Sequence, residues 1–117
     1  DGSFDDWQNV PQLDIAPDEE QAGDALNSAV DIVDIWATND ADNLYISYKL
    51  AGNHNDSYFY HVFMDVDHDS STGFHSAGSH AGIDIMIENT SLWLYSGTNG
   101  EWGWTAGGAP AQAWGTA

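Results

Sequence analysis

The sequence predicts an all-β fold, an antiparallel two-sheet sandwich that is jelly-roll-like and one strand short. Short runs rich in β-branched and aromatic residues recur between clusters of Gly, Asn and Asp, as is typical of such folds. In residues 43–50 apolar and polar side chains alternate, which gives a strand one buried face and one wet face. The chain has 117 residues, enough for one domain with its own core. We therefore expect a single β-sandwich domain over residues 1–117.

Seven runs have the composition and length of strands. In chain order, they are residues 10–15, 30–38, 43–50, 57–66, 82–88, 91–96 and 101–105. In the fifth run three isoleucines alternate with Asp84, Met86 and Glu88, so we expect the isoleucines to face inward and the other three side chains outward. This alternation has the period of a strand and not that of a helix.

The connections are predicted from turn-forming residues. Residues 39–43 and 97–100 are rich in Asn, Asp and Gly, which tolerate positive φ, and each segment predicts a hairpin turn. Residues 16–29 predict a long acidic loop without a substantial helix. The tail from 107 to 117 is rich in Gly, Ala and Pro and does not predict a strong final strand.

Charge excludes several classes of partner. Nineteen Asp and Glu residues face one basic residue, Lys49, which gives a formal net charge of -18. A nucleic acid or an anionic membrane surface would be repelled. No run approaches eighteen apolar residues, so we expect no membrane insertion. The chain starts at Asp1 without an apolar leader, which favours a mature or trimmed product, and it contains no Cys for thiol chemistry.

The most specific motif spans residues 65–73, where carboxylates alternate as a predicted strand gives way to a loop. Ca²⁺ prefers six to eight oxygen ligands, and alternate spacing can turn several side chains toward one centre. We therefore predict a Ca²⁺ site with Asp65, Asp67, Asp69 and Ser71 as ligands. The motif lacks the Gly and Glu of a complete EF-hand, and a solvated acidic turn is the alternative.

A second acidic group could hold another cation. It joins Asp5 and Asp6 near the start of the chain with Asp24, which precedes the second predicted strand. Asp31 and Asp34 follow, and the alternative places both on the wet side of that strand. The five histidines could suggest a transition metal, but they lack the spacing of a zinc motif, so surface or hydrogen-bonded roles are favoured.

The chain has six Trp and five Tyr, more than we expect its core to hold. Trp93 and Tyr95 share one face of a predicted strand, and Trp102 and Trp104 share a face of the next. Together they predict an exposed aromatic strip that would suit a sugar ring or a protein neighbour. The alternative is that half of these rings are core.

Nothing in the sequence supports catalysis. A nucleophile elbow and a phosphate-binding loop are both absent from the sequence. Paired carboxylates, as glycoside hydrolysis needs, occur by chance in a chain with 19 acidic residues. We therefore predict that the protein is not an enzyme.

Three segments resemble the family 9 carbohydrate-binding modules and the related DOMON-like β-sandwiches. They are the opening residues 1–7, the hairpin 39–46, and Phe63-Met64-Asp65-Val66-Asp67 followed by residues 71–73. The resemblance covers residues 1 to about 96. It implies a jelly-roll-like sandwich, bound Ca²⁺ and, in many members, a sugar clamped between aromatic rings on a secreted module. By position, it makes Asp65, Asp67 and Asp69 the cation ligands.

Two functions follow as expectations. The first is an extracellular, non-catalytic, Ca²⁺-binding module that binds a polysaccharide through its exposed aromatics. The second is a self-assembling subunit of an extracellular fibre or matrix, with identical subunits joined by Ca²⁺ bridging and strand complementation. The second rests on the absence of a further apolar strand after residue 105, because an incomplete sandwich exposes an edge. The acidic composition is also typical of a halophilic host.

Overall fold

The computed structural model describes residues 5–11, 25–76 and 80–115. Its regular structure is almost entirely antiparallel β, which confirms the all-β prediction. The chain divides into two compact units. Unit 1 comprises Asp1–Tyr58 and Ala113–Ala117, and unit 2 comprises Phe59–Gln112. Within the described residues, no helix has the length and apolar character needed to cross a membrane.

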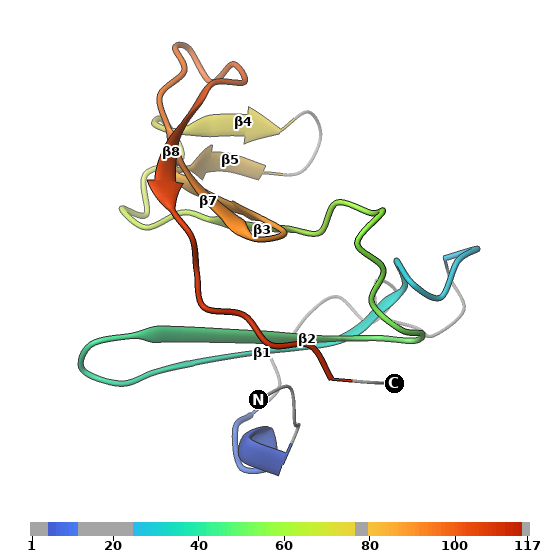
Figure 1. Cartoon of the computed structure of the whole chain (residues 1–117). Coiled ribbons are helices and arrows are strands. Elements are labelled where there is room, and N and C mark those ends of the chain that lie inside the picture. The colour runs from blue at the N-terminus through green and yellow to red at the C-terminus, as the bar shows by residue number, and fades with distance from the viewer. Residues whose placement is uncertain (1–4, 12–24, 77–79, 116–117) are drawn as a thin grey trace. The chain divides into compact units, whose positions relative to one another are not determined.

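The described residues of unit 1 contain one hairpin. Strand β1 (Ile32–Asn39) pairs antiparallel with β2 (Leu44–Leu50), close to the ranges expected from sequence (Figure 1). The turn is closed by a hydrogen bond from the Asp40 N–H to the carbonyl of Asn43, 3.0 Å long. Asp40 Oδ1 also accepts from the N–H groups of Asp42 and Asn43, at 2.8 and 2.7 Å. The predicted turn is confirmed. Its residues were expected to adopt positive φ, but none of them does, and the Asp40 carboxylate stabilises the turn instead.

The register gives this hairpin two different faces. Ile35 lies opposite Tyr48 on one face, and Asp34 lies opposite Lys49 on the other. Trp114, from the C-terminal segment of unit 1, packs edge-on against Tyr48, with ring centroids 5.8 Å apart. It also stacks on His54, with centroids 3.6 Å apart and planes 7° from parallel. The tail is therefore attached to unit 1 through its one aromatic side chain.

In unit 2, the residues that the structure describes form six strands in two sheets. A four-stranded antiparallel sheet has the order β3-β6-β7-β8, and β4 pairs with β5 in a separate hairpin (Figure 1). The strands are β3 (His61–Met64), β4 (Phe74–Ser76), β5 (His80–Ile83), β6 (Ile85–Glu88), β7 (Ser91–Tyr95) and β8 (Trp104–Gly108). The predicted turn at 97–100 is confirmed between β7 and β8, and there Asn99 and Gly100 do have positive φ, 54° and 76°.

Several predicted boundaries were wrong. The expected strand 82–88 is interrupted at Asp84, which ends β5 and precedes β6. The expected strand 57–66 is confined to β3, and the strand at 101–105 begins three residues later, at Trp104. Strand β4 was not predicted, because three residues give too short a pattern to recognise. The expected strand 10–15 falls largely outside the described residues.

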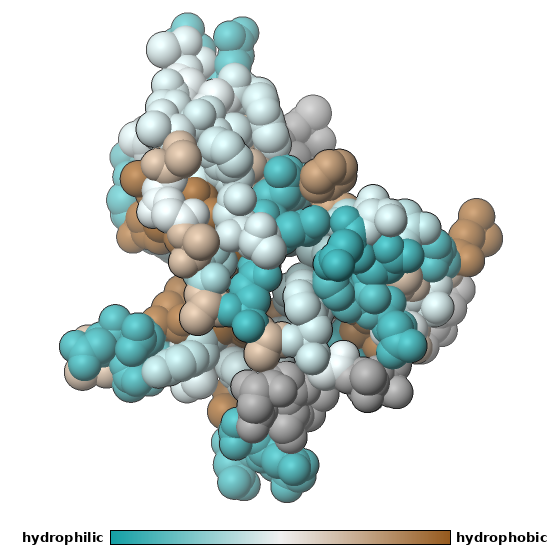
Figure 2. All heavy atoms as spheres, in the orientation of Figure 1, coloured by the Kyte–Doolittle hydropathy of each residue, from teal (hydrophilic) through white to brown (hydrophobic). Residues whose placement is uncertain are grey.

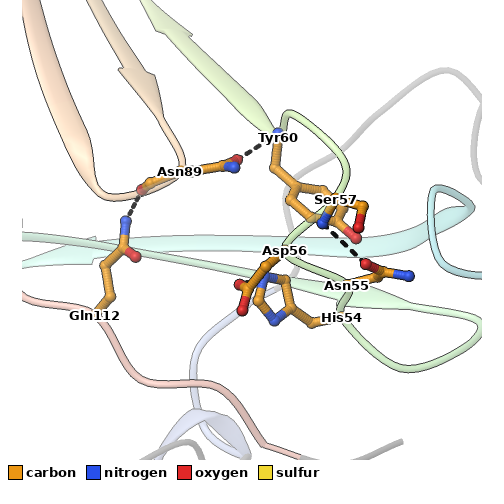
Figure 3. Close-up of polar contacts among 7 residues, drawn as sticks. All are labelled: His54, Asn55, Asp56, Ser57, Tyr60, Asn89 and Gln112. Carbon is orange, nitrogen blue, oxygen red and sulfur yellow. Dashed lines mark hydrogen bonds and ion pairs between the residues drawn. The ribbon is translucent and has the colours of Figure 1, made fainter.

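The turn between β6 and β7 is joined to the segment that leads into β3. Asn89, which has positive φ of 48°, exchanges two hydrogen bonds with Tyr60. The Tyr60 N–H donates to Asn89 Oδ1 at 2.8 Å, and the Asn89 N–H donates to the Tyr60 carbonyl at 3.1 Å. The Gln112 side-chain amide donates to the Asn89 carbonyl (Figure 3). These contacts hold the end of unit 2 against the β6–β7 turn.

The hydrophobic core of the described residues is small. Four hydrophobic side chains are buried: Leu50, Tyr60, Ile83 and Met86. Met86 is only 2% exposed, so the expectation that it faces outward was wrong. Met86 lies between Phe63 of β3 and Trp93 of β7, on the aromatic face of the sheet. Asp31, which one interpretation placed on the wet side of a strand, is also buried.

Hydrophobic side chains also reach the surface at several places (Figure 2). They include Leu44 in unit 1 and Phe59, Val66 and Leu94 in unit 2. Phe59 is 74% exposed, an uncommon position for so large an apolar ring. Exposed apolar side chains of this kind can mark an interaction surface when they gather together.

Candidate metal centre and aromatic surface

Three carboxylates converge in unit 2. One oxygen from each of Asp65, Asp67 and Asp84 lies within 4.8 Å of the others. Asp65 and Asp67 follow β3, whereas Asp84 separates β5 from β6, so two distant segments of the chain build the group. We call these three residues the acidic cluster. Among residues 5–11, 25–76 and 80–115 it is the one group of His and acidic side chains arranged in this way.

The loop that carries Asp65 and Asp67 is folded by its own carboxylates. Asp65 Oδ1 accepts from the His68 N–H at 2.7 Å, and Asp67 Oδ1 accepts from the Asp69 N–H at 2.9 Å. The Thr72 hydroxyl donates to Asp67 Oδ2 at 3.1 Å. Short Asp side chains readily bond to backbone a few residues onward, which explains why an Asp-rich sequence makes a tight loop here.

Asp84 connects the loop to the sheet. Its Oδ2 accepts from the Val66 N–H at 2.9 Å and, more weakly, from the Asp67 N–H at 3.4 Å. Its own N–H donates to the Met64 carbonyl at 2.9 Å, and its carbonyl accepts from the Tyr95 N–H at 2.8 Å. Asp84 therefore lies between β3 and β7 although it belongs to neither strand.

Sequence reasoning missed Asp84 as a member of the cluster. It was expected on the wet face of one continuous strand, where a polar side chain needs no special role. The available signal was a lone acidic residue between Ile83 and Ile85, in a run that otherwise suits a buried strand. Only the pairing of β3 with β6 reveals that this residue lies beside Asp65 and Asp67.

The other predicted ligands have different positions. Asp69 belongs to the same loop but is not one of the three carboxylates of the acidic cluster, and Ser71 follows it in that loop. Asp69 Oδ1 accepts from both the hydroxyl and the N–H of Ser71, at 2.6 and 2.9 Å. The Ser71 hydroxyl bond, followed by the Ser71 N–H bond, lowers the pKa of Asp69 below its ordinary value.

The predicted second cation site lies only partly within the described residues. Asp5 and Asp6 are exposed on a short 3-10 helix, η1 (Asp5–Trp7), in unit 1. Asp24 lies outside the described residues. A second cation site therefore stays a prediction.

Close packing of backbone positions the acidic loop against β5. Gly82 has a φ of +83°, and a Cβ atom there would lie 2.7 Å from the Asp69 carbonyl oxygen. Gly73, at the end of the loop, has a φ of +68°, and a Cβ atom there would lie 2.6 Å from the Ile83 carbonyl oxygen. Only glycine fits both conditions, a positive φ and contact with a neighbouring backbone.

Four aromatic rings of unit 2 form one connected group. Phe74 and Trp102 meet edge-to-face with centroids 5.2 Å apart, and Trp102 meets Trp104 at 5.5 Å. Trp104 in turn meets Tyr95 at 5.5 Å. We call Phe74, Tyr95, Trp102 and Trp104 the aromatic surface. Edge-to-face contacts of this kind fix ring orientation as well as burying area.

The predicted aromatic residues differ in exposure. Trp102 is 58% exposed, whereas Trp93, Tyr95 and Trp104 are half-buried. The Nε1 atoms of Trp93 and Trp104 are buried and have no hydrogen-bond partner among the described residues. Trp93 lies on the same face of the sheet but contacts the core beside Met86. Of the four predicted rings, Trp102 therefore offers the most open surface.

The histidines take part in pairwise contacts. His61 Nε2 lies 2.6 Å from Glu88 Oε2 across the β3–β6 pair. His54 Nε2 lies 3.3 Å from Asp56 Oδ1 in unit 1 (Figure 3). Among the described residues, the group of side chains that could hold a metal ion contains no histidine, and the roles of the histidines stay a prediction.

No family model matches the chain, and comparisons with curated proteins and with solved structures found no similar protein. The resemblance to family 9 carbohydrate-binding modules therefore stays a prediction.

Proposed function

We propose that this chain is a non-catalytic, calcium-binding β module of an extracellular protein that binds carbohydrate through its aromatic surface. The observation that carries the proposal is the convergence of Asp65, Asp67 and Asp84 at one end of the sheet. The jelly-roll-like sandwich expected for such a module is part of the proposal.

The acidic cluster suits a hard divalent cation. Three carboxylates within 4.8 Å repel one another unless a cation or protons neutralise them, and the chain already carries a net charge of -18. The donor set is entirely oxygen, which favours Ca²⁺ or Mg²⁺ over Zn²⁺ or Cu²⁺. Ca²⁺ is favoured because an irregular loop can supply carbonyl oxygens and tolerates variable geometry, whereas Mg²⁺ demands an octahedron.

The aromatic surface suits a sugar ring. Trp102 is exposed, and Phe74 and Trp104 hold its ring from two sides. A flat aromatic face that is already oriented can stack on the apolar face of a pyranose with little loss of side-chain entropy. The acidic loop ends at Gly73, directly before Phe74, so a cation would order the segment that supports Trp102.

The calcium proposal is tested by isothermal titration calorimetry on the wild-type chain and on Asp84→Asn. The amide still offers an oxygen to the Val66 N–H but removes one charge, so we expect Ca²⁺ affinity to fall about tenfold or more. Asp42→Asn, an exposed acidic residue in the unit 1 turn, is the control and should bind Ca²⁺ as the wild type does. Equal affinity of all three proteins would contradict the site.

The carbohydrate proposal is tested by affinity electrophoresis in gels that contain cellulose derivatives, xylan, mannan or soluble chitin. We expect at least one polysaccharide to retard the protein, and Trp102→Ala to reduce that retardation. Phe59→Ala is the matched control, because Phe59 is an exposed ring of the same unit outside the aromatic surface. Retardation that persists in Trp102→Ala, or is absent from every gel, would contradict binding at this surface.

Self-assembly is a second candidate function. The small core, the exposed Leu94 and Val66, and the outer edges of β3 and β8, with which no described strand pairs, favour it. Ca²⁺ would be required to screen the acidic subunits from one another. Fibres or large particles that appear by light scattering and negative-stain microscopy in millimolar Ca²⁺, but not in chelator, would support this function. A monomer in both conditions would exclude it.

A further inference from the structure

Unit 1 contains a hollow that neither the acidic cluster nor the aromatic surface explains. Its volume is about 340 Å³, near the lower end of the range for small-molecule sites. The lining side chains are Trp7, Gln8, Val10, Asp34, Trp36 and Lys49. Lys49 is the only basic residue of the chain, so its place in this lining distinguishes the hollow from the rest of an acidic protein.

Two elements build the hollow. The β1–β2 hairpin contributes Asp34, Trp36 and Lys49, and the register places Asp34 directly opposite Lys49 on the face that also carries Trp36. The opposite side comes from η1 and the turn after it, which contribute Trp7 and Gln8. The hollow therefore lies on the sheet face away from Tyr48, the residue that Trp114 contacts.

Hydrogen bonds hold the η1 side in place. The Val10 N–H donates to the Trp7 carbonyl at 3.0 Å, which closes the turn after η1. The Gln8 side-chain amide donates to Asp5 Oδ1 at 3.3 Å. These bonds fix the local conformation of η1 and of the turn after it.

The lining is selective about charge. An anionic ligand would be repelled by a chain of net charge -18. A cationic ligand, which two tryptophans and a carboxylate could otherwise attract, would meet the ammonium group of Lys49. A neutral ligand with both an apolar face and polar edges satisfies both conditions.

The polar groups match a ligand with several hydroxyls. The Asp34 carboxylate accepts hydrogen bonds, the Lys49 ammonium donates them, and the Gln8 amide does both. A sugar hydroxyl is itself a donor and an acceptor, and the carbon face of a pyranose packs well on an indole ring. We propose that this hollow binds one ring of a neutral saccharide, in a subsite separate from the aromatic surface. The proposal shares a ligand class with the proposed function but uses none of the same residues and needs no Ca²⁺.

The test follows the indole N–H signals of the six tryptophans in ¹⁵N-labelled protein by NMR. Single Trp→Phe variants assign the signals. The probes are cellohexaose, xylohexaose, mannohexaose and chitohexaose, with choline as a cationic probe. We expect at least one saccharide to shift the Trp7 and Trp36 signals, both in the wild type and in Trp102→Ala, and with or without chelator.

Variants of the lining separate binding from folding. Trp36→Ala removes the stacking ring, but it could also unfold the hairpin. Lys49→Gln is therefore the second variant, because Lys49 is exposed and Gln keeps a polar side chain of similar reach. We expect Lys49→Gln to weaken binding at the hollow about tenfold, the loss typical of one hydrogen bond to a charged group.

Each outcome decides between the two sites. Shifts at Trp7 and Trp36 that survive Trp102→Ala support the hollow, even if the aromatic surface proves inactive. Shifts confined to Trp102 and Trp104 overturn the hollow but leave the proposed function intact. Shifts produced by choline alone, unchanged affinity of Lys49→Gln, or no shift of Trp7 and Trp36 with any saccharide would each overturn the proposal.

Discussion

Asp40 organises the β1–β2 turn through both of its carboxylate oxygens. Oδ1 accepts from two backbone N–H groups of the turn, and Oδ2 accepts from the Tyr45 hydroxyl at 2.7 Å. These bonds, the Tyr45 hydroxyl first, lower the pKa of Asp40 below its ordinary value, because they stabilise the charged form. The same contact raises the pKa of Tyr45.

The pH dependence of this turn follows from the direction of that shift. The folded pKa of Asp40 lies below the unfolded value of 3.8, so its contribution to stability is present above that value and is lost as the pH falls through the folded pKa. Tyr45→Phe removes the strongest of the bonds, so we expect the pKa of Asp40 to rise. A ¹³C NMR titration of the side-chain carboxylates measures it.

Asp69 provides the internal control for this titration. Its pKa is lowered by Ser71, in unit 2, and should not change in Tyr45→Phe. If Asp40 titrates at the same pH in both proteins, the Tyr45 hydroxyl does not cause the shift.

At the scale of elements, contact between the acidic loop and β5 depends on glycine. Gly82 has positive φ and lies against the Asp69 carbonyl, whereas Gly108, at the end of β8, also has positive φ but has open space around it. The two glycines therefore share a conformational requirement and differ in packing.

Gly82→Ala is expected to destabilise the protein by roughly 2 to 4 kcal/mol, because the methyl group forces the loop and β5 apart. Gly108→Ala should lower the free energy of unfolding by about 1 kcal/mol, because only the positive φ disfavours alanine there. Urea denaturation gives both values. Equal costs would show that packing of the loop on β5 contributes nothing, and Ca²⁺ affinity should also fall in Gly82→Ala alone.

For the whole molecule, the dominant property is a net charge of -18, and few hydrophobic side chains are buried in the part of the chain that the structure describes. Repulsion among carboxylates opposes folding, and salt weakens that repulsion without binding at any one place. A Ca²⁺ ion that bound only the native state would stabilise it further, by about 2.7 kcal/mol at a hundredfold excess over the dissociation constant.

Thermal unfolding separates the two effects. In chelator, we expect Tm to rise as NaCl is added, because the charges are screened. At constant high salt, we expect millimolar Ca²⁺ to raise the Tm of the wild type further, and to raise the Tm of Asp84→Asn by less, because the variant binds Ca²⁺ more weakly. If Ca²⁺ raised the Tm of both proteins equally, Ca²⁺ would act by screening charge and not by binding at the acidic cluster.

The local features of this protein were determined by its sequence. The β1–β2 hairpin, strand β7 and both tight turns follow from alternation and turn residues that lie within a few positions of one another. Asp65 and Asp67 could be predicted as candidate cation ligands for the same reason, since both belong to one short motif. Strand β4 and the break in the strand at Asp84 could not be predicted, because neither has a repeating sequence pattern.

The tertiary structure alone decided which distant residues meet. Asp84 joins Asp65 and Asp67, and Met86 is buried beside Trp93, because β6 pairs with both β3 and β7. The hollow in unit 1 depends in the same way on η1 lying against one face of the β1–β2 hairpin. Alternation tells which side chains share a face of a strand, but strand pairing and packing set which face is covered and by what.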